Sequence, residues 1–244
     1  MPSTHRSSTG ASAPALVVMA KEPAVGQTKT RLCPPLTPSQ AAELYAAMLS
    51  DTLRLVSSLA NIAPAVAVTP PEAIHTFADL IHPTSSSDSA GASGARMRLM
   101  PVAGHDIGDC LDQVLTQLLA AGHPVAMALN SDGPTLPPAI IQRAVTSLAT
   151  ANVVLGPSED GGYYLIGLKQ PAPGLFKDID WSTEQVTRQT LDRAQTLRLS
   201  VALLPPWYDV DTAADLTRLR AELDVLSDND LPFTRRFFAR HFPV

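Results

Sequence analysis

Short runs of consecutive apolar residues recur along the chain, and each is followed by a polar, turn-forming stretch. Runs of this kind are typical of strands that are buried on both faces of a sheet. They predict strands at residues 15–20, 65–68, 97–102, 125–129, 152–156 and 201–204, with a further strand beginning at Tyr163.

Between these runs, apolar residues return every three or four positions, which is the period of a helix with one buried face. Helices are predicted at 70–81, 138–148 and 183–197, and another is predicted to end at Ala121. Two more are predicted to begin at the capping pairs Thr37–Gln40 and Thr212–Asp215. The alternation of strands and helices predicts one α/β domain over residues 15–244, with a mostly parallel sheet and helices on both faces.

Three segments lie outside this pattern. Residues 1–14 are rich in Ser and Thr and lack an apolar core, so we expect a disordered tail and not a secretory signal. Residues 83–95 are rich in Ser, Gly and Ala, which predicts a flexible insertion. Residues 233–244 are basic and aromatic, which favours either a helix that covers a sheet face or the contact of a homodimer.

The composition excludes several classes of protein. A net charge of −5 on 244 residues leaves no general basic surface for nucleic acid. No apolar run approaches the roughly 20 residues of a transmembrane helix, so no membrane partner is expected. Two cysteines do not make a disulfide framework, and reduced thiols in a cytoplasmic protein are the expectation.

One stretch, residues 129–137, places a single carboxylate at the end of a predicted strand. Asp132 follows the apolar run, and Gly133 and Pro134 turn the backbone after it. Ligands of open α/β sheets bind at the carboxyl ends of strands, and hard cations such as Mg²⁺ take oxygen ligands. Asp132 is therefore predicted to act in catalysis by holding a divalent cation; the alternative is a turn residue or helix N-cap.

The loop that follows the first predicted strand carries positive charge and a glycine. Lys21, Lys29 and Arg31 lie close together in the sequence, and Gly26 allows the backbone to approach a ligand. Cations beside an accessible backbone suit a nucleotide diphosphate. The spacing is not that of a P-loop, and the alternative is a solvated basic surface loop.

A double glycine, Gly161 and Gly162, lies between two predicted strands, with Asp160 before it and Tyr163 after it. Glycines let a substrate lie close to the backbone, and a carboxylate there can orient an acceptor hydroxyl or act as a general base. Asp160 is therefore a candidate catalytic residue, and the two glycines, Tyr163 and Trp181 are candidate acceptor contacts. The alternatives are a hairpin turn for the glycines and a packing role for Trp181.

Two further segments offer candidate ligands. Asp209 and Asp211 point the same way if their segment is extended, and Asp211 is predicted to complete the cation site with Asp132. Gly108 lies in a strand-to-helix turn where the base or ribose of a nucleotide can rest. The alternative is that this turn only starts a helix, with the neighbouring Asp106 as its N-cap.

Together these segments resemble a family of GT-A-like transferases first recorded as a domain of unknown function, DUF2064, and often associated with radical-SAM or selenium-related gene neighbourhoods. The matching segments are Lys21–Pro23 with Gly26 and Lys29–Leu32, Asp106–Gly108, Ser131–Pro134, Gly156–Pro157 with Asp160–Tyr164, Trp181–Thr183, and Asp209–Thr212 with Asp215–Leu216. The resemblance implies the fold of the nucleotide-diphospho-sugar transferases. That superfamily also contains nucleotidyltransferases, including the guanylyltransferase that activates 2-phospholactate, so the reaction must be argued from the site.

The leading hypothesis is a transferase that moves a sugar from a nucleotide-diphosphate-sugar to a small acceptor, assisted by Mg²⁺ or Mn²⁺. The alternatives are a nucleotidyltransferase acting on a phosphorylated small molecule and a non-catalytic nucleotide-binding domain. The first loop has one glycine where nucleotidyltransferases often have several, which favours the sugar transferase. The central segment has one carboxylate where many sugar transferases have Asp-x-Asp. A metal would therefore need Asp211 as a second ligand, or more ligands from the nucleotide and water.

Overall fold

Strands and helices alternate along residues 12–81 and 97–243, the part of the chain that the computed structural model describes. The strands are β1 (Ala15–Lys21), β2 (Ala63–Thr69), β3 (Arg98–Pro101), β4 (Ala126–Leu129), β5 (Val153–Pro157), β6 (Tyr163–Leu168) and β7 (Val201–Leu203). The α-helices are α1 (Pro38–Ser58), α2 (Ile74–Ile81), α3 (Ile107–Ala120), α4 (Pro138–Ser147), α5 (Val186–Thr196), α6 (Ala213–Val225) and α7 (Pro232–His241), and the 3-10 helices are η1 (Thr30–Leu32) and η2 (Pro71–Ala73). The predicted tail as far as residue 11 and the predicted insertion at 83–95 lie outside the described residues.

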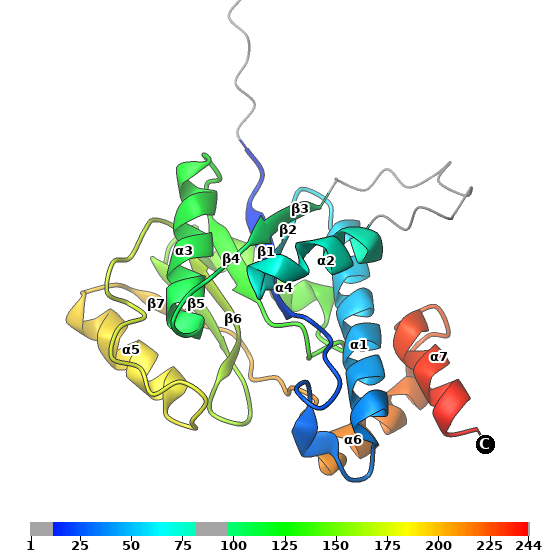
Figure 1. Ribbon diagram of the computed structural model, residues 1–244. Coiled ribbons are helices and arrows are strands. Elements are labelled where there is room, and N and C mark those ends of the chain that lie inside the picture. The colour runs from blue at the N-terminus through cyan, green and yellow to red at the C-terminus, as the bar shows by residue number, and fades with distance from the viewer. Residues whose placement is uncertain (1–11, 82–96, 244) are drawn as a thin grey trace, which may run out of the picture.

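The seven strands form one sheet in the order β3-β2-β1-β4-β6-β5-β7 (Figure 1). Strand β1 pairs in parallel with β2 and β4, β2 with β3, and β5 with β7. Strand β6 runs antiparallel to both of its neighbours, β4 and β5. The prediction of a single α/β domain with a mostly parallel sheet is therefore confirmed.

The order of the strands places a topological switch point between β1 and β4. After β1 the chain adds β2 and β3 on one side of it, and then returns to place β4 on the other side. In open α/β sheets, ligands bind outside the carboxyl ends of the strands at such a point. The predicted ligands Lys29 and Asp132 follow these two strands directly in the sequence.

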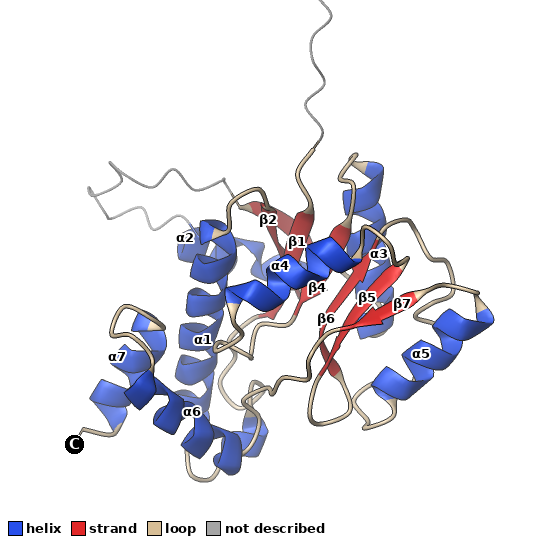
Figure 2. Cartoon of the chain, turned by 180° about the vertical axis from the view of Figure 1, so that it is seen from behind, coloured by secondary structure: helices blue, strands red, loops and turns tan. Residues whose placement is uncertain are grey.

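Helices cover both faces of the sheet because its strands are apolar on both faces. Strand residues such as Val18 and Leu129 pack in one cluster with α1, α4, α6 and α7. The intervening residues, such as Val17 and Ala128, pack in a second cluster with α3 and α5. Figure 2 shows α4 and α3 on opposite sides of the sheet, as predicted. Within the described residues, no helix combines the length and the apolar character needed to cross a membrane.

The predicted capping pairs are confirmed at α1 and α6, where Thr37 with Gln40 and Thr212 with Asp215 form complete capping boxes. Helix α5 differs from its prediction, because it begins at Val186 and not at Thr183. The Thr183 hydroxyl donates to the carbonyl of Asp180 (2.7 Å) and accepts from the amide of Gln185 (3.2 Å). These local bonds hold a separate turn before the helix, since Thr side chains compete for nearby backbone groups.

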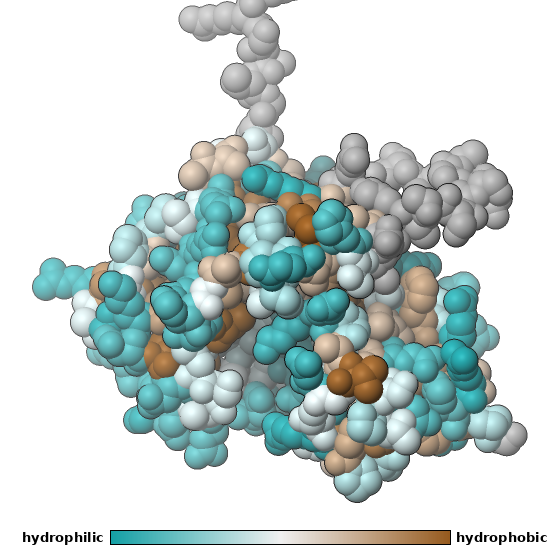
Figure 3. Space-filling view, viewed as in Figure 1, coloured by the Kyte–Doolittle hydropathy of each residue, from teal (hydrophilic) through white to brown (hydrophobic). Residues whose placement is uncertain are grey.

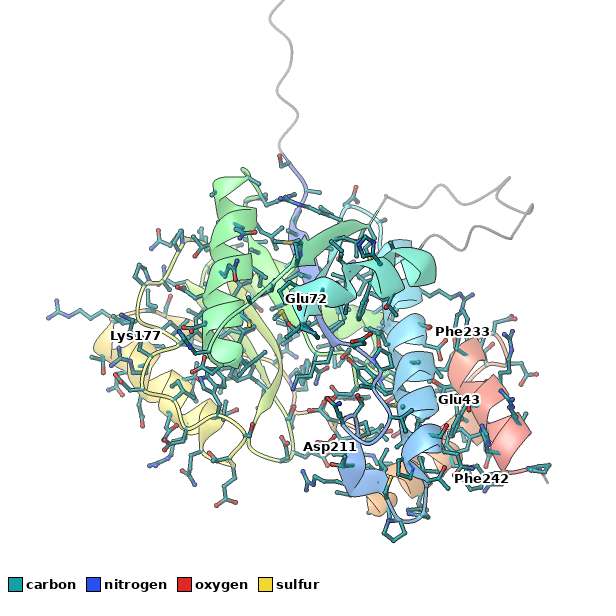
Figure 4. The ribbon with its side chains drawn as sticks, in the orientation of Figure 1. Glu43, Glu72, Lys177, Asp211, Phe233 and Phe242 are labelled. Atoms are coloured by element: carbon teal, nitrogen blue, oxygen red, sulfur yellow. The ribbon has the colours of Figure 1, made fainter. Side chains whose placement is uncertain are left out.

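The C-terminal aromatic segment forms α7, which packs against α1 and not directly on a sheet face. Phe237 and Phe238 are buried in the core, and Figure 4 labels Phe233 and Phe242 at the two ends of α7, with Glu43 on the neighbouring α1. The buried Asp51 of α1 accepts from the first free amide of α7, that of Phe233, and from the next. The aromatic residues therefore serve the packing between these two helices.

Candidate functional site

A cleft of about 400 Å³ lies at the carboxyl ends of β1 and β4, the topological switch point of the sheet. Five of the predicted ligands line it, namely Lys21, Lys29, Arg31, Asp132 and Asp211. In Figure 3 the surface is hollowed in the lower centre of the view, with hydrophilic residues along its edge. The structure thus brings together charged residues from the first loop, the turn after β4 and the segment after β7.

Lys29 lies between the two carboxylates that the sequence analysis assigned to a cation. Its Nζ donates to Asp132 Oδ2 (2.6 Å) and pairs directly with Asp211 Oδ1. Arg31 Nη1 lies 3.8 Å from the other oxygen of Asp211. In Figure 4 the labelled Asp211 lies beside the loop that follows β1. The three segments thus meet at one point, where an ammonium group joins the two acids.

The environment of Lys29 keeps its side chain charged. Only 7% of the side chain is exposed, and burial alone lowers the pKa of a lysine. Asp132 and Asp211 outweigh this effect and raise the pKa of Lys29 above its usual value. The backbone of Lys29 is left-handed (φ 54°) at the start of η1, which directs the side chain toward the cleft from a tight turn. The ammonium group in this environment therefore stays positively charged at the switch point.

Bonds between the strand ends hold the acidic residues in place. The amide of Val210 donates to the carbonyl of Asp132 (2.9 Å). The Asn130 side-chain amide donates to Asp209 Oδ1, and the Ser158 hydroxyl donates to Asp209 Oδ2 (3.0 Å). These contacts join the ends of β4, β5 and the segment after β7. Asp209 is therefore a structural link beneath Asp132.

Asp209 is also electrostatically linked to Asp132. Burial, followed by repulsion from the Asp132 carboxylate, raises the pKa of Asp209 to about 7. The Asn130 and Ser158 donors favour the ionised form and limit this rise. The sequence indicated that Asp209 and Asp211 point the same way if their segment is extended. Nothing in the neighbouring sequence identified Asn130 and Ser158 as the partners of Asp209.

Tyr45 and Ser131 are cleft residues that the sequence analysis did not identify as such. Tyr45 belongs to α1, and only 3% of it is exposed. Its hydroxyl accepts from the amide of Lys21 (3.0 Å) and shares a hydrogen bond with the Ser131 hydroxyl (2.9 Å). Tyr45 thus connects α1 to the ends of β1 and β4. Helical periodicity cannot distinguish this role from ordinary packing.

Asp160 lies beside the cleft and not in it. It lines a separate hollow of about 70 Å³ that also includes Arg31 and Asp211, which are shared with the cleft. Its side chain is exposed, and its Oδ1 accepts from the amide of Gly162 (3.0 Å). The carboxylate of Asp160 thus lies in a mostly acidic hollow, with Arg31 as its one cationic lining residue among those that the structure describes.

The two glycines form the turn of the β5–β6 hairpin, the alternative that the sequence left open. Gly161 has φ +91°, and a Cβ atom on it would lie 2.3 Å from the carbonyl oxygen of Glu184. The carbonyl oxygens of Gly161 and Gly162 accept from the amide and hydroxyl of Thr187. Gly161 is therefore required by the close approach of two backbone segments, and neither glycine lines the cleft or the hollow around Asp160.

Gly108 and Trp181 are packed against each other. A Cβ atom on Gly108 would lie 2.7 Å from the Trp181 ring, and the same ring meets Tyr163 edge-on with centroids 6.3 Å apart. Tyr163 lines a small, mostly apolar hollow of about 80 Å³ that shares Asn130 with the cleft. Asp106 caps α3 by accepting from the amide of Asp109. Trp181 therefore has the packing role that the sequence left open, and Gly108 makes room for its ring.

Gly26 remains apart from the other predicted ligands. It adopts φ +76° in the loop after β1, and a Cβ atom on it would meet nothing within 4 Å. It does not line the cleft, so its part in the site is to let the loop turn before Lys29.

The oxygens of Asp132 and Asp211 are donors of the kind that Mg²⁺ and Mn²⁺ prefer. They lie close enough to share one ammonium group, so a single cation between them fits the donor chemistry. Across residues 12–81 and 97–243, no group of three or more His, Cys, Asp or Glu side chains is arranged to hold a metal. A metal here would need further oxygen donors from a ligand such as a phosphate.

Several solved structures are similar to this one. One from Desulfovibrio desulfuricans G20, described as a "putative nucleotide-diphospho-sugar transferase", has 26% sequence identity and a TM-score of 0.76, covering 93% of this chain and 95% of that chain. A 4-diphosphocytidyl-2C-methyl-D-erythritol synthase from Anaerococcus prevotii DSM 20548 has 10% identity and a TM-score of 0.57, covering 88% and 97%. A CMP:2-keto-3-deoxy-manno-octonic acid synthetase in complex with CTP has 13% identity and a TM-score of 0.52, covering 88% and 99%.

The last two likenesses, at 13% identity or less, show a shared fold alone. A search of curated proteins found no match to the chain. A family described as "Uncharacterized protein conserved in bacteria (DUF2064)" matches residues 52–183, which is more than half of the chain. The protein whose cleft joins Lys29 to Asp132 and Asp211 therefore belongs to the DUF2064 family.

Proposed function

We propose that the protein is a transferase that takes a sugar from a nucleotide-diphosphate-sugar and passes it to a small acceptor. The observation that carries this proposal is the meeting of Lys29, Asp132 and Asp211 in a cleft that Lys21 and Arg31 also line. A cleft of about 400 Å³ is of the size that small-molecule ligands fill. The description of the relative from Desulfovibrio desulfuricans G20 supports the same class of donor.

The cations of the cleft suit a diphosphate leaving group. When the bond between the sugar and the diphosphate breaks, negative charge develops on the diphosphate oxygens. Lys21, Lys29 and Arg31 would stabilise that charge, because fixed positive groups aimed at a developing charge lower the barrier. A divalent cation at Asp132 and Asp211 would add further positive charge at the diphosphate.

The acceptor side of the reaction is assigned to the hollow around Asp160. This hollow shares Arg31 and Asp211 with the cleft, so an acceptor in it would lie next to the bound donor. Asp160 is exposed and carries a free carboxylate oxygen that can accept a proton from a hydroxyl group. Holding both reactants in adjacent sites supplies part of the rate enhancement.

The second candidate function is nucleotidyl transfer to a phosphorylated small molecule. The fold is shared with a 4-diphosphocytidyl-2C-methyl-D-erythritol synthase and with a synthetase in complex with CTP. In this reaction a phosphate of the acceptor attacks the α-phosphate of a nucleoside triphosphate, and pyrophosphate leaves. The same three cations would stabilise the triphosphate, whereas a single glycine in the first loop favours the sugar transferase.

The two reactions are separated by their leaving groups. The protein is first screened by thermal shift with nucleotides and nucleotide-sugars, with and without Mn²⁺, since a ligand of the native state raises the apparent melting temperature. Turnover is then measured with the ligands found and a panel of small hydroxyl-bearing and phosphorylated acceptors. Release of nucleoside diphosphate supports glycosyl transfer, and release of pyrophosphate from a triphosphate supports the second candidate. A non-catalytic domain would be indicated by two results together: nucleotide binding that survives Asp132→Ala, and no turnover of any acceptor by the wild-type protein.

A further inference from the structure

The space between Asp132 and Asp211 is filled by a positive group of the protein itself. Lys29 Nζ is in direct contact with one oxygen of each carboxylate, and the lysine side chain is almost completely buried. Burial strengthens these ion pairs, because water screens them less. The single positive charge of Lys29 therefore offsets half of the charge of the two acids before any metal or nucleotide arrives.

A divalent cation bound by both acids would need the place that the ammonium group holds. Nζ lies 2.6 Å from Asp132 Oδ2, and a metal bound to the same oxygen would lie at a comparable or shorter distance. An ammonium and a divalent cation repel each other strongly at such separations. Arg31, 3.8 Å from Asp211, adds to this repulsion. In the free protein, Lys29 and the metal thus compete for one position.

A nucleotide in the cleft would change this competition. The side chain of lysine is a flexible four-carbon chain with three donors, and Lys29 has the cleft beside it. Phosphate groups in the cleft offer this ammonium charged oxygens as alternative partners. If Lys29 turns toward them, Asp132 and Asp211 become free for a divalent cation, which also gains the phosphates as ligands.

We propose that Lys29 occupies the cation position between Asp132 and Asp211 in the free protein and leaves it when the phosphates of a nucleotide enter the cleft. Metal then binds to the nucleotide complex in preference to the free protein. This inference deepens the proposed function and rests on it for the identity of the incoming ligand. The competition between Lys29 and the metal, however, is measurable with no nucleotide present.

The test compares Mn²⁺ binding by the wild-type protein and by Lys29→Met, using electron paramagnetic resonance of free Mn²⁺ and no nucleotide. Methionine has a similar length and no charge, so it removes the competitor and leaves both acids. We expect Lys29→Met to bind Mn²⁺ at least tenfold more tightly than the wild-type protein. Lys29→Met with Asp132→Asn should lose this gain, because Asp132 would provide one of the ligands.

The matched control is Lys21→Met. Lys21 lines the same cleft but forms no ion pair with Asp132 or Asp211, so its loss changes the net charge equally without freeing an acid. We expect less than a threefold change in Mn²⁺ affinity for this variant. An equal gain in both variants would overturn the proposal, since general charge would then explain it.

Unchanged or weaker Mn²⁺ binding by Lys29→Met would also overturn the proposal. Circular dichroism and thermal unfolding check that the variant is folded, and Lys29→Gln replaces it if it is not. Failure of the proposed function would take a different form, namely no release of nucleoside diphosphate or pyrophosphate by the wild-type protein. That result leaves the comparison of Mn²⁺ affinities intact, so the two failures can be distinguished.

Discussion

The backbone amide of Val210 donates a hydrogen bond to the carbonyl oxygen of Asp132, with 2.9 Å between the two atoms. This bond joins the turn after β4 to the segment after β7, and it places the carboxylates of Asp132 and Asp211 on the same side of the sheet edge. Because the link is made by the backbone, it does not depend on the side chains that line the cleft. Substitutions of those side chains should therefore change the chemistry of the site more than its shape.

Asp132→Ala should abolish metal-dependent turnover and leave the fold intact. We expect the rate to fall by about 100-fold or more, because one ligand of the cation is lost. The free energy of unfolding should change by only about 1 kcal/mol, since Asp211 still pairs with Lys29. Steady-state kinetics and urea denaturation measure the two effects. Asp112→Ala, at an exposed position of α3, is the control and should retain full activity.

Asp209 should make stability depend on pH. Its pKa is raised from 3.8 to about 7 by burial and by Asp132, so between about pH 4 and pH 7 the folded protein binds more protons than the unfolded chain. The free energy of unfolding should fall as the pH rises through this window, by at most about 4 kcal/mol. Asparagine cannot titrate, so Asp209→Asn should lose this decrease. Urea denaturation at pH 5 and pH 8 checks this, and equal pH dependence of both proteins would contradict it.

Gly161→Ala should be strongly destabilising. The new Cβ would lie 2.3 Å from the Glu184 carbonyl oxygen, and alanine would also be strained at φ +91°. We expect a loss of roughly 2–4 kcal/mol in the free energy of unfolding. Gly26→Ala is a matched control, because its φ is +76° but nothing lies within 4 Å of the new atom. It should lose only about 1 kcal/mol, and equal losses in the two variants would show that the contact with Glu184 does not matter.

Gly108→Ala should disturb the packing of Trp181. The added methyl group would lie 2.7 Å from the ring, which must move. We expect a loss of about 1–3 kcal/mol in the wild-type background, and a smaller loss in a Trp181→Ala background where the ring is absent. A double-mutant cycle by denaturant unfolding measures the difference. Additive effects would mean that the two residues do not interact.

The strands and α-helices of this protein could be predicted with the correct type and nearly correct bounds, whereas the 3-10 helix η1 was predicted as part of a loop. Apolar runs located the strands, and the pairs Thr37–Gln40 and Thr212–Asp215 marked helix starts that the structure confirms. The start of α5 was predicted at the wrong residue. Thr183 is of a type that often caps helices, but its hydroxyl forms hydrogen bonds within its own turn. A residue that can cap a helix can also close a turn, and the choice depends on the surrounding packing.

The charged residues of the candidate site could be predicted from the sequence, but their arrangement could be predicted only in part. Three cations, Lys21, Lys29 and Arg31, were predicted to bind a diphosphate, and Asp132 and Asp211 to bind a metal ion. All five line one cleft. The double glycine and Gly108 were expected near ligands. In the structure, Gly161 leaves room for the backbone of Glu184, and Gly108 leaves room for the Trp181 ring. A glycine in the sequence indicates that space is needed, but it does not indicate whether a ligand or another part of the protein fills that space.

Local features of the sequence specify the order of strands and helices, the turns that follow them, and which charged residues stand at the strand ends. These are local properties, set by periodicity and by the conformational preferences of a few residues. Two features emerge only in the folded protein: β6 lies antiparallel between β4 and β5, and Lys29 joins acids 103 and 182 positions away. Such contacts depend on the packing of the whole sheet and on the balance between burial and charge at one point, and neither has a signal within a short stretch of sequence.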